Sequence, residues 1–166
     1  MQRCIIDGIE YIGICSEKKN KFKHIKEYQI NTIWKLEEGF EDILTVISVS
    51  VEKEKLDFNI IDNKKGQNIS GEICHEKSLV IEVTYKIKLK YSSFKNNNSI
   101  FIYKFSQNIF LNANIPSKIG GENIIDLKRI GKIKIEECLV DMYINNIEKR
   151  CFELNLGGVI LLEEII

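Results

Sequence analysis

A strict alternation of apolar and polar positions runs through residues 79–91, LVIEVTYKIKLKY. Every odd position is large and apolar or aromatic, and the even positions from Glu82 to Lys90 are polar or charged. Because side chains of an extended strand point alternately to opposite faces, this spacing predicts one long strand with a buried face and a wet face. A helix would spread the same apolar residues around its whole circumference.

A second alternating run covers residues 100–111 and follows the polar connection SSFKNNNS. Its large apolar residues share one face, and they are Phe101, Tyr103, Phe105, Ile109 and Leu111. The asparagines between the two runs tolerate the left-handed backbone that tight connections need. The two runs therefore predict an antiparallel hairpin with an aromatic-rich inner face.

Five further segments carry the same two-residue signal with interruptions. They are residues 3–15, 22–34, 45–62, 130–144 and 151–156. The last segment, VILLEEII at residues 159–166, is too apolar for a free tail. We expect it to be paired in a sheet or buried against a partner, because an exposed apolar edge invites aggregation.

The interruptions predict local features of these strands. Gly8 and Gly13 indicate a bulge or bend in the first strand, since glycine inside a strand usually marks one. Between Glu52 and Lys55 the apolar positions change from odd to even, which indicates a turn or a bulge. The paired asparagines 145 and 146 predict the turn of a second hairpin, and residues 117–127 predict a plain turn.

Residues 35–44, KLEEGFEDIL, differ in kind from their surroundings. Their apolar positions fit one helical stripe, so they predict a short acidic helix or turn across the open end of a sheet. Four carboxylates gather there, namely Glu37, Glu38, Glu41 and Asp42. They are typical of a solvated face, and the alternative is an acid/base site that uses His75.

These patterns together predict a mainly β fold: an antiparallel, sandwich-like single domain over residues 1–166, with one short acidic helix or turn near residues 35–44. The chain has 166 residues with 24 basic and 24 acidic side chains. A net charge of zero argues against a general nucleic-acid or anionic-membrane binder. No apolar run reaches the roughly 20 residues of a bilayer span, and Asp7 and Glu10 lie where a signal peptide needs apolar residues. We therefore expect a cytoplasmic protein.

The five cysteines show no CxxC spacing, which favours neither a disulfide framework nor a zinc ribbon. Four of them lie in apolar, strand-like surroundings and are predicted to be reduced core residues: Cys4, Cys15, Cys138 and Cys151. Cys74 stands beside His75 in a polar loop and could contribute to a metal site. Because no matching pair of ligands accompanies them, we predict no metal and no cofactor.

Several segments resemble the SPOCS domain, a sporulation-associated family of clostridia. The matching stretches are KLEEGFEDILTVISVSVE at 35–52, the long strand that ends at Tyr91, FSQNIFLNANIP at 105–116, IKIEECLVDMY at 133–143 and CFELNLGGVILLEEI at 151–165. The similarity implies that residues 1–34 supply N-terminal strands and that residues 35–166 form the core of the family domain. It also implies a non-enzymatic role in assembling the spore coat or spore envelope, located in the mother-cell cytoplasm or in the coat. The implied partners are other spore-morphogenetic or coat proteins, or further copies of the chain.

We expect an assembly module, since the chain has no nucleophile elbow, phosphate loop or HExxH motif. The predicted interaction surface comprises Lys86, Lys88, Lys90, Ile160 and Leu162. The same lysines could form a basic stripe with Lys132 and Lys134, which is more typical of a solvated face than of a nucleic-acid site. The alternative is a polysaccharide-binding β-sandwich that uses the aromatic residues Tyr85, Tyr91, Phe101, Tyr103 and Phe105, although side chains that share one strand face are more typical of a core.

Overall fold

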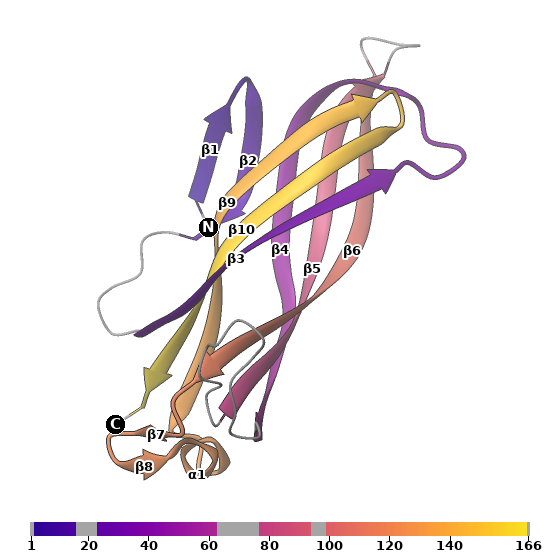
Figure 1. The fold of residues 1–166 in the computed structure, drawn as a ribbon. Coiled ribbons are helices and arrows are strands. Elements are labelled where there is room, and N and C mark those ends of the chain that lie inside the picture. Colours follow the sequence, from indigo (N-terminus) through magenta and orange to yellow (C-terminus); the bar gives the residue numbers. More distant parts are fainter. Residues whose placement is uncertain (1, 16–22, 63–76, 94–98, 166) are drawn as a thin grey trace, which may run out of the picture.

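The computed structural model describes residues 2–15, 23–62, 77–93 and 99–165. Their strands form two packed sheets and a small ribbon (Figure 1). The large sheet has the order β1 (Gln2–Ile6), β2 (Ile9–Ile14), β4 (Ile43–Asp62), β5 (Lys77–Ser93) and β6 (Ile100–Ile115). The small sheet has the order β3 (Lys23–Lys35), β10 (Cys151–Glu164) and β9 (Ile133–Glu148). All neighbours are antiparallel except β2 and β4, so the predicted mainly β, sandwich-like fold is confirmed.

The core lies between the two sheets and is built around β5. All seven odd residues from Leu79 to Tyr91 are buried, as the alternation predicts. The β5–β6 hairpin is confirmed, with Ile87 opposite Phe105 and Tyr91 opposite Phe101. Rings from the small sheet complete the core, because Trp34 and Phe152 pack on Phe105 with centroid distances of 4.3 and 5.8 Å. Aromatic pairs at such distances add to the free energy gained by burial alone.

A β-bulge explains the change of phase in β4. Lys53 lies opposite Tyr85 while Lys55 lies opposite Thr84, so Glu54 is the extra residue. The predicted turn or bulge is therefore a bulge, and β4 continues as one strand through it. An extra residue moves the following side chains to the other face. As a result Lys53 and Leu56 both point into the sandwich.

The N-terminal segment is a hairpin, and our prediction of a single bent strand was wrong. Asp7 and Gly8 both have positive φ, at 51° and 81°, which is the geometry of the two-residue turn that Asp-Gly favours. The predicted bulge at Gly13 is confirmed, because Gln2 lies opposite Ile14 and Arg3 opposite Ile12. A Cβ on Gly13 would lie 2.1 Å from the carbonyl oxygen of Val51, so only glycine fits there.

The acidic segment 36–42 forms a turn and not a helix. It carries the chain from the small sheet to the large one, and its ends bond to the β9–β10 turn through Leu36 N to Arg150 O (2.8 Å) and Ile43 N to Lys149 O (2.6 Å). Leu36 and Ile43 are buried, and Phe40 meets the edge of the Tyr103 ring. The apolar spacing that suggested a helical stripe reflects these three anchors.

One of the two predicted turns is confirmed and the other was misplaced. The confirmed turn lies at Gly120 and Gly121, which both have positive φ, at 58° and 90°. Residues 117–127 contain the ribbon β7 (Lys118–Ile119) and β8 (Glu122–Asn123) and begin helix α1 (Ile124–Arg129), whose first turn is capped by the Asn123 side chain accepting from Ile125 N at 2.9 Å. The second hairpin turns at Lys149 and Arg150, because β9 runs on through both asparagines to Glu148.

Strand β10 confirms the prediction that the final segment is paired in a sheet. It lies between β3 and β9, so both of its backbone edges are bonded. Gly158 on β10 lies directly opposite Tyr28 on β3. A Cβ on Gly158 would lie 2.3 to 2.6 Å from the hydroxyl and ring atoms of Tyr28. Gly158 therefore makes room for the one tyrosine that β3 sends into the polar centre of the sandwich.

We expect Gly158→Ala to lower the free energy of unfolding by about 1–3 kcal/mol, because the added methyl group would overpack against the Tyr28 ring. Urea denaturation followed by circular dichroism measures this. Gly157→Ala is the matched control, since its Cβ would meet Asp141 Cβ at 3.3 Å and needs only a small adjustment. Equal losses for the two variants would contradict the assigned contact.

Candidate interaction surface

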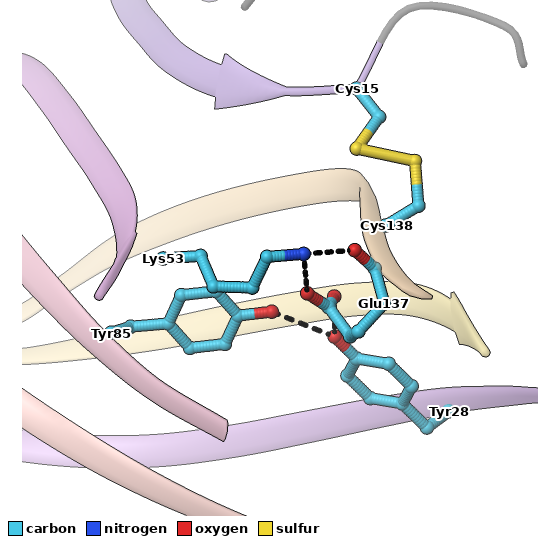
Figure 2. Close-up of a disulfide and its surroundings, with 6 residues drawn as sticks. All are labelled: Cys15, Tyr28, Lys53, Tyr85, Glu137 and Cys138. Carbon is cyan, nitrogen blue, oxygen red and sulfur yellow. Dashed lines mark hydrogen bonds and ion pairs between the residues drawn. A yellow bond between two sulfur atoms is a disulfide. The ribbon is translucent and has the colours of Figure 1, made fainter. Parts of the chain in front are cut away.

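A buried carboxylate lies between the two sheets. Glu137 on β9 is 1% exposed and accepts a hydrogen bond from the Tyr28 hydroxyl, which lies 3.1 Å from the Tyr85 hydroxyl (Figure 2). Lys53 Nζ lies 3.3 Å from the second carboxylate oxygen and also donates to the backbone carbonyl of Glu137. The cluster therefore joins β3, β4, β5 and β9.

Burial and a neighbouring charge favour the protonated form of the two tyrosines still further. Desolvation, and then the charge of Glu137, raise the pKa of Tyr28 and of Tyr85 far above the usual value. Both hydroxyls therefore stay protonated at neutral pH and can donate hydrogen bonds. The partners of the two Glu137 oxygens are Tyr28 on the small sheet and Lys53 on the large sheet. We call Glu137, Tyr28, Tyr85 and Lys53 the clamp, because these bonds hold the two sheets together.

A disulfide lies next to this cluster and corrects our prediction of reduced cysteines. Cys15, just after β2, is bonded to Cys138 on β9, with the Cα atoms 5.7 Å apart and a sequence separation of 123 (Figure 2). No spacing motif can reveal a bond over such a distance, because only the fold brings the two residues together. Cys4 and Cys151 are free and half-buried, whereas Cys74 and His75 lie outside the described residues.

Three of the four sheet edges are bonded across the corners of the sandwich. On one side, Cys15 N donates to Leu139 O at 2.7 Å, and Ile144 N donates to the Tyr11 hydroxyl at 3.3 Å, so β2 covers the edge of β9. On the other side, Lys26 Nζ donates to Asn112 O, which joins β3 to β6. Gln107 Nε2 on β6 also donates to Thr32 Oγ1 on β3 at 2.6 Å.

Strand β1 is the open edge. It lies outside β2 in Figure 1, and within the described residues it pairs with β2 alone. Counted from the Ile6–Ile9 pair beside the turn, the alternation of an antiparallel ladder points the backbone N–H and C=O groups of Arg3 and Ile5 away from β2. Ile5 is 75% exposed, so the edge offers unpaired backbone groups beside an exposed apolar side chain.

Three of the five predicted interaction residues lie on the outer surface, and the other two are buried. Lys86 and Lys88 are exposed and Lys90 is half-buried, all on the outer face of β5. Ile160 and Leu162 are 0% and 4% exposed, so the structure corrects their assignment to an interaction surface. They point into the core because they share the inner face of β10 with Phe152 and Leu156. The sequence could not show that this terminal segment lies between two other strands.

The predicted basic stripe is not continuous. Lys132 and Lys134 lie just before and within β9 of the small sheet, apart from the β5 lysines of the large sheet. The lysine that does join the β5 row is Lys104 on β6, directly opposite Lys88. The sequence contained this signal, because the register of the predicted hairpin determines which residues are opposite one another.

The residues that suggested other functions are used in the fold. Tyr85, Tyr91 and Tyr103 are buried and Phe101 and Phe105 are half-buried, so the polysaccharide-binding alternative loses its aromatic platform. In the acidic turn, Arg150 lies 3.7 Å from Asp42 and donates to the backbone carbonyl of Glu37 at 2.6 Å. No group of three metal-ligating side chains occurs in the part of the chain that the structure describes.

Comparison with known proteins gives no relative: no family model, no curated protein and no solved structure matches the chain. No helix within the described residues is long and apolar enough to cross a membrane. The geometry of the sheets is therefore the basis for the functional argument.

We expect Glu137→Leu to lower the free energy of unfolding by about 2–4 kcal/mol, because it removes the acceptor of a buried tyrosine and the partner of Lys53. Chemical denaturation measures the loss. Glu153→Leu serves as the control, since Glu153 bonds to Asn31 and Asn145 on the outer face, and it should cost less than about 1 kcal/mol. Similar losses in both variants would refute the clamp.

Reduction of the Cys15–Cys138 bond should lower the free energy of unfolding by about 2–4 kcal/mol, since the bond closes a very long loop in the unfolded chain. The measurement is denaturation with and without a reductant, and Cys15→Ala/Cys138→Ala should be as stable as the reduced protein and indifferent to the reductant. Peptide mapping of unreduced protein that recovers alkylated Cys15 would contradict the assignment.

Proposed function

We propose that this chain is a non-enzymatic assembly module that binds an extended segment of another protein chain by strand addition at β1. The observation that carries the proposal is the contrast between edges among the described residues: β1 is bonded to β2 alone, whereas β3, β6 and β9 are each linked to the opposite sheet by hydrogen bonds that mostly use side chains. Strand addition takes its affinity from main-chain hydrogen bonds at such an edge and its specificity from alternate side chains.

The chemistry of β1 fits an apolar strand as the partner. Natural proteins protect open edges with lysine, proline or inward-pointing charges. In β1 the single charged residue is Arg3, and its guanidinium lies 3.5 Å from Glu10 on the neighbouring strand. Ile5 stands beside it on the same face, where an incoming strand would cover it. A second copy of β1 is the simplest partner, because it brings the same apolar residues to a two-fold contact.

The setting of this assembly is a further part of the proposal. The resemblance to the SPOCS domain favours the spore coat or envelope, with coat proteins as partners. A disulfide is typical of proteins that reside in oxidising surroundings. Between the two expected locations, the Cys15–Cys138 bond therefore favours the coat over the mother-cell cytoplasm.

We expect Ile5→Lys to weaken self-association, or retention of coat proteins from sporulating cells, by about tenfold or more, because burial of an isoleucine contributes roughly 1.5–3 kcal/mol. Light scattering over a range of concentrations measures the first, and capture by immobilised protein measures the second.

The matched control is Ile33→Lys. Ile33 is 68% exposed and also lies on an edge strand, but that edge is bonded to β6. The proposal predicts normal association for this variant. A chain that stays monomeric at every concentration and retains no coat protein would overturn it, and so would equal weakening by the two substitutions.

A further inference from the structure

A shallow groove crosses the outer face of the large sheet, on the side opposite the core. It has a volume of about 400 Å³ and is lined by side chains from three adjacent strands. The strand register arranges them in two rows, Glu52–Lys86–Ser106 and Ser50–Lys88–Lys104. Each row runs across β4, β5 and β6.

The two rows differ in charge balance. In the first row Glu52 lies opposite Lys86, and Lys86 Nζ also lies 2.6 Å from a carboxylate oxygen of Glu54. The second row places Lys88 directly opposite Lys104 and contains no carboxylate. Among the residues that the structure describes, no acidic side chain pairs with either of these lysines.

Two like charges at directly opposite positions destabilise a sheet. The folded chain therefore holds an uncompensated pair of ammonium groups in a hollow, although its net charge is zero. Lys90 extends the row of lysines along β5, with Ser48 and Ile102 as its neighbours. An anion in the groove would remove the repulsion between Lys88 and Lys104.

We propose that this groove binds the phosphate group of a small soluble ligand, with Lys88 and Lys104 as the charged contacts. The hydroxyl groups of Ser50 and Ser106 line the same groove and supply two more donors. Four donors match the several oxygens of a phosphate better than the two oxygens of a carboxylate. Lysine binds phosphate as a point charge, and a volume of this size accommodates a small molecule. The proposal is independent of strand addition at β1, because it uses other strands and another face.

The test is isothermal titration of the whole chain with tripolyphosphate at low salt, using wild type, Lys104→Glu and Lys132→Glu. The two variants change the net charge equally, but Lys132 lies outside the groove. We expect wild type and Lys132→Glu to bind alike. Lys104→Glu should bind at least about tenfold more weakly, since its carboxylate would neutralise Lys88 and repel the ligand.

Two controls keep the result interpretable. Lys104→Glu should melt no lower than wild type, because it replaces a repulsive pair with an attractive one, so its loss of binding cannot be attributed to unfolding. Amide chemical shifts on titration should move at residues 86–88 and 104–106. Absence of binding, equal weakening in both variants, or shifts confined to other strands would each overturn the proposal.

Discussion

The structure depends on one buried carboxylate between two sheets. Glu137 could not lie there alone, because an unpaired charge in a protein interior is costly. Lys53 compensates its charge, and Tyr28 donates a hydrogen bond to it. Lys53 points inward by the regular alternation that continues from Val51, and the bulge at Glu54 brings Leu56 to the same inner face after it. Gly158 leaves space for the Tyr28 ring.

This clamp has a consequence for the edges of the sandwich. It fixes β9 against the strands of the large sheet, at the same level where Cys138 is bonded to Cys15. From Cys15 and Tyr11, strand β2 then bonds to the edge of β9, and β1 is left on the outside of β2. The open edge that we propose as the binding surface therefore follows from the bonds that join β2 to β9.

Much of the fold could be predicted from the sequence. The alternation in residues 79–91 and 100–111 gave the central hairpin and its buried face, and the change of phase at Glu52 to Lys55 located the bulge. Local signals were misjudged where the same residue type occurs both in turns and in strands. Asp7 and Gly8 form a hairpin turn, whereas the asparagines 145 and 146 are ordinary strand residues. The clamp and the disulfide could not be predicted, because they join residues that are 57 to 123 positions apart in the sequence. The open edge could not be predicted either, because it depends on the order of the strands in the sheet.

The central claim is that, in the part of the chain that the structure describes, β1 is the edge strand with no bond to the opposite sheet. Hydrogen exchange of single amides, followed by NMR in dilute solution, tests it most directly, since exchange reports which backbone groups are bonded. The account predicts that the amides of Arg3 and Ile5 exchange quickly. The amides of Cys15, just after β2, and of Ile144, on the edge strand β9, are protected by their bonds to Leu139 and Tyr11. Protection of Arg3 and Ile5 in the dilute monomer, or rapid exchange at Cys15 and Ile144, would contradict it.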